Sequence, residues 1–137
     1  MKKIFTGIAI ALLLSLSLFA FTGCEFTSFT GSSSNMNHNY NAGVWTVSAA
    51  RVNGNLRRSV TMSAENLENF RAVSTATEGT VELVLTQGDT IERIALDDSF
   101  VTVQHIDMSA FNAEDGRIQV RLNFANVRNL SAIISWN

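Results

Sequence analysis

The sequence is poor in the residues that build several common kinds of functional site. Its 137 residues include one cysteine, two histidines and no proline, and charged residues make up only 16%. A single cysteine excludes an internal disulfide, and two histidines exclude a histidine-rich metal site. The formal net charge of −2 provides no basic footprint for nucleic acid. Because 46% of the residues are hydrophobic, disorder throughout is excluded, and the length suits one domain.

The amino terminus has the pattern of an export leader that ends at the only cysteine. Two lysines at positions 2 and 3 precede an apolar run at positions 8–21, which is shorter than the ~20 apolar residues that a spanning helix needs. The run is followed by Thr22 and Gly23, directly before Cys24. These residues resemble the lipobox signal of bacterial lipoproteins, although Phe21 stands where that family favours leucine.

The resemblance implies that residues 1–23 are a signal peptide and that Cys24 is the lipidation site. In that family the thiol receives a diacylglycerol and the new amino terminus is usually acylated too, commonly with palmitate. The implied location is the extracytoplasmic face of the cell membrane, held there by lipid. A plain secretory leader and a membrane anchor are the alternatives, disfavoured by the lack of an A-x-A-like site and by the short apolar run. Cleavage leaves eight arginines, no lysine and twelve acidic residues, a formal net charge of −4.

Residues 24–42 are predicted to be a lipidated cysteine followed by a flexible tether. Serine, threonine, glycine and asparagine dominate this segment, and it has no apolar periodicity. A coil of this length spans on the order of 25 Å, enough to hold a domain clear of the head groups. His38 lies among asparagines without partner ligands, so no metal site is expected there.

Residues 43–137 alternate apolar and polar side chains with a period of two, which predicts an all-β domain. About eight strands at this spacing are typical of an antiparallel β-sandwich, here expected to be jelly-roll-like. Asn53-Gly54 and Asp115-Gly116 are typical of hairpin turns, and Gly79 and Gly88 indicate two further turns. The expected strands are 44–52, 56–63, 70–75, 81–86, 90–96, 100–106, 118–124 and 130–136.

One short helical turn is expected between the second and third of these strands. Ser63 is a good N-cap residue, and Glu65 follows it in the first turn. Leu67 and Phe70 are spaced to face inward together. The segment therefore predicts a corner between strands.

Two pairs of large side chains are candidates for a binding surface. Trp45 and Trp136 lie near the two ends of the domain, where exposed rings would form a carbohydrate platform. Core packing is the favoured interpretation, because both lie within alternating runs. Arg57 and Arg58 are neighbours on a strand and point to opposite faces, so a solvated edge is expected rather than one pocket.

No arrangement of residues predicts catalysis, a cofactor or a metal. His105 and Asp107 with one of many serines would make a Ser-His-Asp set, but no G-x-S-x-G elbow is present. Asp97, Asp98 and Asp107 are candidates for a structural Ca²⁺ site, yet they lack the D-x-D-x-D pattern. The sequence therefore does not predict an enzyme.

The domain itself resembles small uncharacterised lipoproteins of Firmicutes over nearly all of residues 43–137. The resemblance rests on the Trp45 strand, the Ser-Ala-Glu-Asn-Leu corner, the Gly-Arg-Ile-Gln-Val-Arg-Leu strand and the terminal Ile-Ser-Trp. At fold level the domain is similar to galactose-binding-like jelly-roll modules, without a matching sugar site. The favoured function is a non-catalytic binding module for a glycan, a peptide or a partner protein of the envelope, bound to the membrane through its lipid. It is favoured because roughly 95 folded residues leave little room for a deep active-site cleft beside the core. An enzyme accessory domain or weak hydrolase, and a structural envelope protein without a ligand, are the alternatives.

Overall fold

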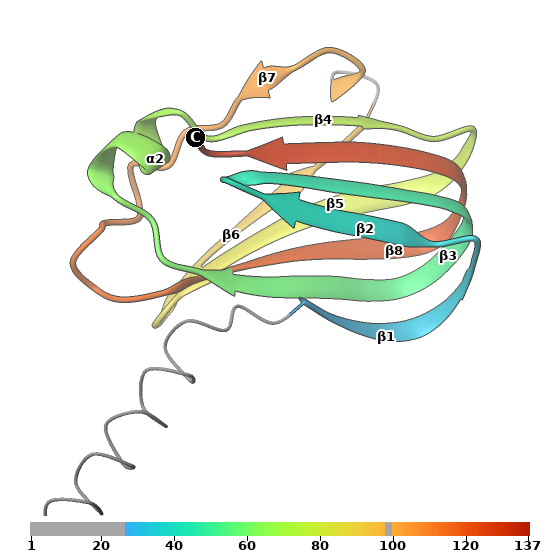
Figure 1. Ribbon diagram of the computed structural model, residues 1–137, viewed down its shortest axis with the longest axis horizontal. Coiled ribbons are helices and arrows are strands. Elements are labelled where there is room, and N and C mark those ends of the chain that lie inside the picture. Colours follow the sequence, from blue (N-terminus) through green and yellow to red (C-terminus); the bar gives the residue numbers. More distant parts are fainter. Residues whose placement is uncertain (1–26, 98–99) are drawn as a thin grey trace, which may run out of the picture.

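The computed structural model describes residues 27–97 and 100–137, and the leader and Cys24 lie outside this part of the chain. Within it the fold is all-β and antiparallel, a sandwich-like arrangement of eight strands with one helical turn. Figure 1 shows the strands running side by side and turning back at one end of the molecule. The elements are β1 Thr27–Ser34, β2 Asn37–Asn41, β3 Val44–Val60, α2 Ala64–Glu68, β4 Arg71–Thr75, β5 Glu78–Gln87, β6 Thr90–Ala95, β7 Gln104–His105 and β8 Ile118–Ser135.

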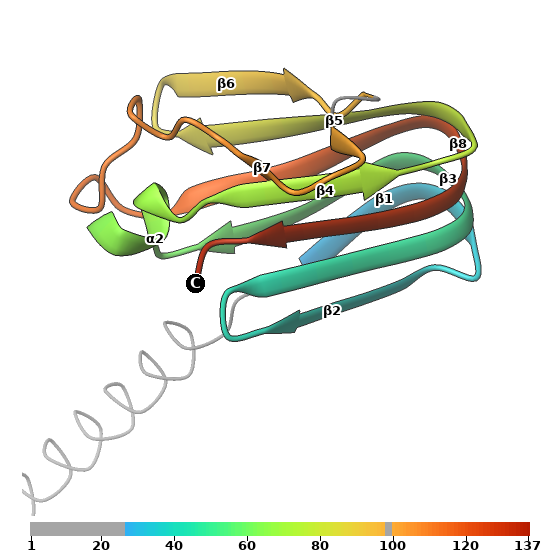
Figure 2. The same ribbon diagram turned by 90° about the horizontal axis from the view of Figure 1, so that it is seen from above.

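Two long strands, β3 and β8, bend and contribute to both layers of the sandwich. The first layer contains β2, residues 44–52 of β3, residues 127–135 of β8, β4 and β7. The second layer contains β1, residues 54–60 of β3, residues 118–124 of β8, β5 and β6. Figure 2 shows the two layers from above, with β2 and β6 toward opposite sides of the molecule. The fold is therefore one sheet folded over onto itself.

The bend explains why the sequence pattern wrongly predicted two strands in place of β3 and two in place of β8. Asn53-Gly54 is not a hairpin turn, because β3 continues through it with a register shift between Val52 and Gly54. Gly54 has a φ of +130°, and a Cβ there would collide with the carbonyl oxygen of Thr30 on β1. Glycine is needed at this position for its backbone conformation and for the close approach of β1. The expected strands 118–124 and 130–136 are likewise one strand, β8, which bends near Asn126 at a φ of +51°.

The segment expected to be a flexible tether is part of the sheet. Residues 27–34 and 37–41 form β1 and β2, which pair antiparallel with β3 in one continuous register. The hairpin turn lies at Ala42-Gly43, where both φ angles are positive, as a type I′ turn requires. The prediction of a tether over 24–42 is therefore wrong for residues 27–41. These edge strands pair with β3 through backbone hydrogen bonds, and the hydrophobic side chains of Phe29, Tyr40 and the intervening Met36 pack on the core.

Three other turn and strand predictions differ from the structure. Residues 100–106 contain only the two-residue strand β7. Asp115-Gly116 lies in the loop before β8 and joins no hairpin, since β7 pairs with β4. Gly79 lies within β5, at a second register shift, where a Cβ would collide with backbone oxygens of β8. Gly88 does form the turn between β5 and β6, as expected.

The core lies between the two layers and confirms the alternating pattern. Ile118, Val120, Leu122 and Phe124 of β8 are all buried. The helical corner is also confirmed: Ser63 caps α2 in a capping box with Asn66, and Phe70 is fully buried. The remaining inward side chains from both layers include Trp45, Val47, Leu56, Val60, Leu83, Leu85, Leu130 and Ile134.

Candidate functional site

The two tryptophans are part of the core and not a surface platform. Trp45 is fully buried and Trp136 is 2% exposed, so the favoured interpretation of the sequence is confirmed. The Trp136 ring stacks on Phe70 at 5.8 Å and on Tyr40 at 5.6 Å between ring centroids. A sugar-stacking site built from these two indole rings is therefore excluded.

Arg58 belongs to the interior and was wrongly expected to be solvated. Arg57 is exposed and Arg58 is 8% exposed, so the two do point to opposite faces of β3. The Arg58 guanidinium carbon lies 3.7 Å from the centre of the Tyr40 ring, and Nη1 donates to Thr27 Oγ1 at 2.7 Å. A buried arginine therefore joins the edge strands β1 and β2 to the second half of β3. Neither arginine lies on an edge strand, because β3 is flanked by β1 and β8.

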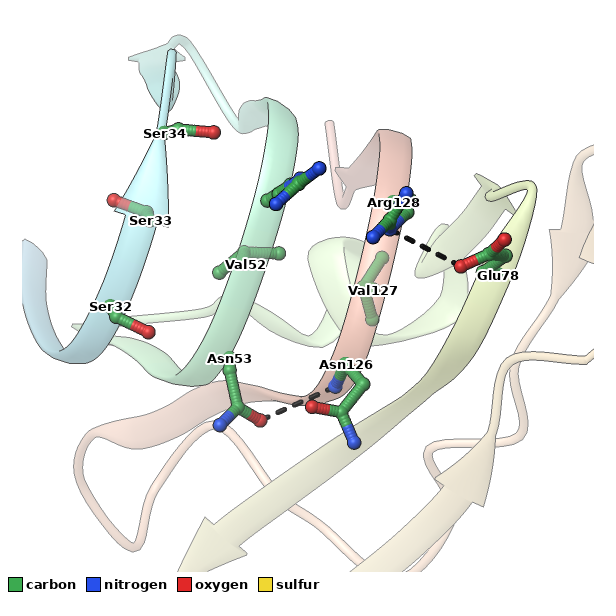
Figure 3. Close-up of a pocket in the computed structure, with 10 residues that line it drawn as sticks. Ser32, Ser33, Ser34, Val52, Asn53, Glu78, Asn126, Val127 and Arg128 are labelled. Carbon is green, nitrogen blue, oxygen red and sulfur yellow. Dashed lines mark hydrogen bonds and ion pairs between the residues drawn. The ribbon is translucent and has the colours of Figure 1, made fainter.

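A polar groove of about 500 Å³ crosses the sheet at its bend. Figure 3 shows the residues that line it, which come from β1, β3, β5 and β8. We call it the bend groove. Its lining residues are Ser32, Ser33, Ser34, Arg51, Val52, Asn53, Glu78, Asn126, Val127 and Arg128.

Two arginines from different strands lie opposite each other in the bend groove. Arg51 of β3 is in register with Arg128 of β8, and Ser34 is in register with Arg51 on its other side. Glu78 of β5 is in register with Arg128, and its Oε2 lies 3.2 Å from Arg128 Nε (Figure 3). Among residues 27–97 and 100–137, Arg51 has no carboxylate partner. The row Ser34, Arg51, Arg128 and Glu78 thus contains two guanidinium groups and one carboxylate.

The bend fixes the backbone on which these side chains stand. The backbone N–H of Asn126 donates to Asn53 Oδ1 at 3.3 Å, across the point where β3 and β8 both turn (Figure 3). The Arg128 carbonyl accepts from the backbone N–H of Thr77 at 3.0 Å. Val52 and Val127 belong to the hydrophobic core. Guanidinium groups on such a rigid frame suit carboxylate or phosphate oxygens, which they bind through paired N–H donors.

A second hollow of about 660 Å³ lies beside α2 and holds the residues considered for catalysis. His105 Nε2 is hydrogen-bonded to the carbonyl oxygen of Glu68 at 2.5 Å. Asp107 Oδ1 accepts from the backbone N–H of Ser109 at 3.0 Å. That bond, then the Ser109 hydroxyl and the nearby His105, hold the pKa of Asp107 below its ordinary value. The Asp107 carboxylate therefore accepts hydrogen bonds from Ser109 in its own loop, and it is not arranged to donate a proton.

The proposed metal ligands do not come together in the described part of the chain. Asp98 lies outside it, and residues 27–97 and 100–137 contain no group of three or more His, Cys, Asp or Glu side chains that would hold an ion. His38 is exposed on β2. In the same residues, no helix has the length and apolar character needed to cross a bilayer.

Comparison with family models and with curated proteins finds no match for this chain. The sequence did not indicate the bend groove, because Arg51 and Arg128 are far apart in the chain and meet only through the register of β3 with β8. In the sequence, each of these two residues is simply an arginine at a polar position of an alternating strand. That pattern is ordinary for a solvated face of a sheet.

Proposed function

We propose that this protein is a lipid-anchored extracytoplasmic lipoprotein that acts as a non-catalytic binding module. The anchor is the acylated Cys24, after removal of residues 1–23. Support comes from the order of the leader: a cationic start, a short apolar run and small residues directly before the only cysteine. Two or three acyl chains give stable attachment, because each buried CH₂ contributes about 0.8 kcal/mol.

The ligand is an anionic group, a carboxylate or a phosphate, carried by an envelope glycan or peptide. The observation that carries this proposal is the register pair Arg51 and Arg128. Within the part of the chain that the structure describes, Glu78 is the only carboxylate ion-paired with either arginine. Like charges directly opposite on neighbouring strands destabilise a sheet. A bound anion relieves this repulsion and accepts hydrogen bonds from both guanidinium groups. The hydroxyls of Ser32 and Ser34, which alternate with Ser33 and lie on the face of Arg51, add neutral donors along the same groove.

Binding fits the bend groove better than catalysis does. Its polar side chains are hydroxyls, amides, two guanidinium groups and one carboxylate. The carboxylate is that of Glu78, and its Oε2 is engaged with Arg128 Nε at 3.2 Å. A nucleophile with an adjacent base is therefore lacking in this groove.

The test is a titration of the chain 24–137, carrying Cys24→Ser, with inorganic phosphate, followed by backbone amide NMR shifts. We expect saturable shifts at Ser34, Arg51 and Arg128. Arg51→Gln should weaken binding about tenfold or more, because a charge-assisted hydrogen bond contributes about 1.5–3 kcal/mol. Arg71→Gln is the matched control, since Arg71 is an exposed arginine on β4 outside the groove. Equal losses of phosphate affinity in the two variants, or NMR shifts spread evenly over all arginines, would refute a specific site.

A further inference from the structure

A row of arginines crosses the outer face of the second layer, away from the bend groove. Ser28 of β1 is in register with Arg57 of β3, and Arg57 is in register with Arg121 of β8. The next strand places Val84 beside Arg121, and β6 places Arg93 beside Val84. Residues in register share one face of an antiparallel sheet. We call Arg57, Arg121 and Arg93 the arginine row.

The burial of Val84 shows how this face is covered. Val84 is 1% exposed, yet among the described residues it is the one buried aliphatic side chain that does not belong to the core cluster. It stands in register between Arg121 and Arg93, and the alkyl stem of an arginine is able to cover an apolar neighbour of this kind. Arg121 Nε is buried and has no hydrogen-bond partner among the described residues. Arg121, at the centre of the row, is therefore partly buried, whereas Arg57 and Arg93 are exposed.

The charges of the row are only partly neutralised. Arg93 Nη1 lies 3.1 Å from Glu82 Oε1, and the same oxygen accepts from Asn123 Nδ2 at 3.0 Å. In residues 27–97 and 100–137, neither Arg57 nor Arg121 is paired with a carboxylate. Ile91, on the same strand as Arg93 and two residues before it, is 55% exposed. This face combines a local positive charge with an exposed apolar side chain.

The row begins close to the proposed lipid in the chain. Ser28 is the fourth residue after Cys24, so their Cα atoms are at most about 14 Å apart. Neighbouring strands are about 4.8 Å apart, which places Arg57 one strand and Arg121 two strands from Ser28. Because residue 27 already belongs to β1, the edge of the sandwich at Ser28 stays within this distance of the proposed lipid.

We propose that the outer face of the second layer lies on the membrane surface, with the arginine row on the phosphate groups of anionic lipids. This inference rests on the proposed acylation of Cys24. Guanidinium groups bind phosphate oxygens through paired donors, and anionic lipid surfaces attract nearby arginines. Ile91 enters the interface beside them. The orientation leaves the opposite face, which carries Ile133, directed away from the bilayer.

The first test measures the orientation of the acylated protein in vesicles of phosphatidylcholine with or without phosphatidylglycerol. The thiol of Cys24 is consumed by the lipid, so Ile91→Cys or Ile133→Cys supplies a unique site for a fluorophore. Ile133 is 40% exposed on β8 in the first layer and is the matched control. We expect quenchers on the lipid head groups to act on position 91 and not on 133, and more strongly with phosphatidylglycerol. Equal quenching at both positions overturns the inference.

The second test separates this inference from the lipid anchor. The chain 24–137 with Cys24→Ser contains every buried core residue and is sedimented with phosphatidylglycerol vesicles. Arg57→Gln and Arg121→Gln should each weaken binding about fivefold, and Arg71→Gln by no more than about twofold. Binding to soluble polyphosphate but not to vesicles overturns the inference. If the full chain carries no acyl group while the soluble chain still binds these vesicles, the proposed acylation of Cys24 is wrong. The proposed contact of the arginine row with anionic lipid is then supported.

Discussion

Arg51 and Arg128 lie directly opposite each other on β3 and β8, and Glu78 is the only carboxylate ion-paired with either of them in the described chain. Their meeting depends on the bend, because β3 and β8 change register there with Gly54 and Asn126 at positive φ. The groove is thus a consequence of folding one sheet into two layers. Its chemistry follows from an excess of positive charge held on a rigid backbone.

Glu78 should compete with an anionic ligand for the groove. Glu78→Gln removes the carboxylate 3.2 Å from Arg128 Nε and should raise the affinity for phosphate about threefold. The loss of stability should stay below about 1 kcal/mol, because the ion pair is exposed. Phosphate titration at low ionic strength measures the effect. Glu92→Gln, on β6 and outside the groove, should leave the affinity unchanged, and a weaker affinity in Glu78→Gln would contradict the account.

Gly54 should be intolerant of any side chain. Gly54→Ala places a Cβ against the Thr30 carbonyl at a φ of +130°, so we expect a loss of about 2–4 kcal/mol in urea unfolding. Gly88→Ala is the matched control, because that glycine has a φ of +58° and open space around it. Its cost should be about 1 kcal/mol. Similar costs at the two positions would mean that the close approach of β1 to β3 does not matter.

Tyr40 should be essential to the attachment of the edge strands. Tyr40→Ala removes the ring that lies between Arg58 and Trp136, and should cost about 2–4 kcal/mol while changing tryptophan fluorescence. His38→Ala, on the same strand and exposed, should cost less than about 0.5 kcal/mol. If both substitutions were neutral, residues 37–41 would behave as the tether that the sequence suggested.

Asp107 should stabilise the fold only where it is ionised. Its pKa is held below the ordinary value by the backbone N–H of Ser109, then by the Ser109 hydroxyl and His105. A lowered folded-state pKa contributes stability above the ordinary aspartate range and loses it as pH falls through the folded value. The stability difference between the wild-type chain and Asp107→Asn should therefore be larger at pH 7 than at pH 3. NMR titration of the carboxyl carbon gives the pKa, and an ordinary or raised value would contradict the Ser109 contact.

The sequence predicted those parts of the fold whose pattern is local. Alternation identified the strand from Ile118 to Phe124, and Ser63 marked the start of α2. The strands within residues 27–41 were not predicted, because edge strands are held by backbone hydrogen bonds to β3. Polar residues form these bonds as well as apolar ones do. Asn53-Gly54 was wrongly predicted to be a hairpin turn, because glycine suits a hairpin turn and a bend within a strand equally well.

The candidate site was less predictable than the fold. Arg51, Arg128 and Glu78 come from three strands, and only the register of those strands brings them together. The same holds for the arginine row, in which Arg57, Arg121 and Arg93 belong to β3, β8 and β6. Sequence periodicity gives the face on which a residue lies within its own strand, but not its neighbours across the sheet.

The most direct test of the account is the intact mass of the protein extracted from membranes, compared with a Cys24→Ser variant. The account predicts a mass equal to residues 24–137 plus acyl groups, and no acylated species in the variant. An unacylated product cut at another position would contradict it, because the protein would then be released from the membrane that the proposed function requires.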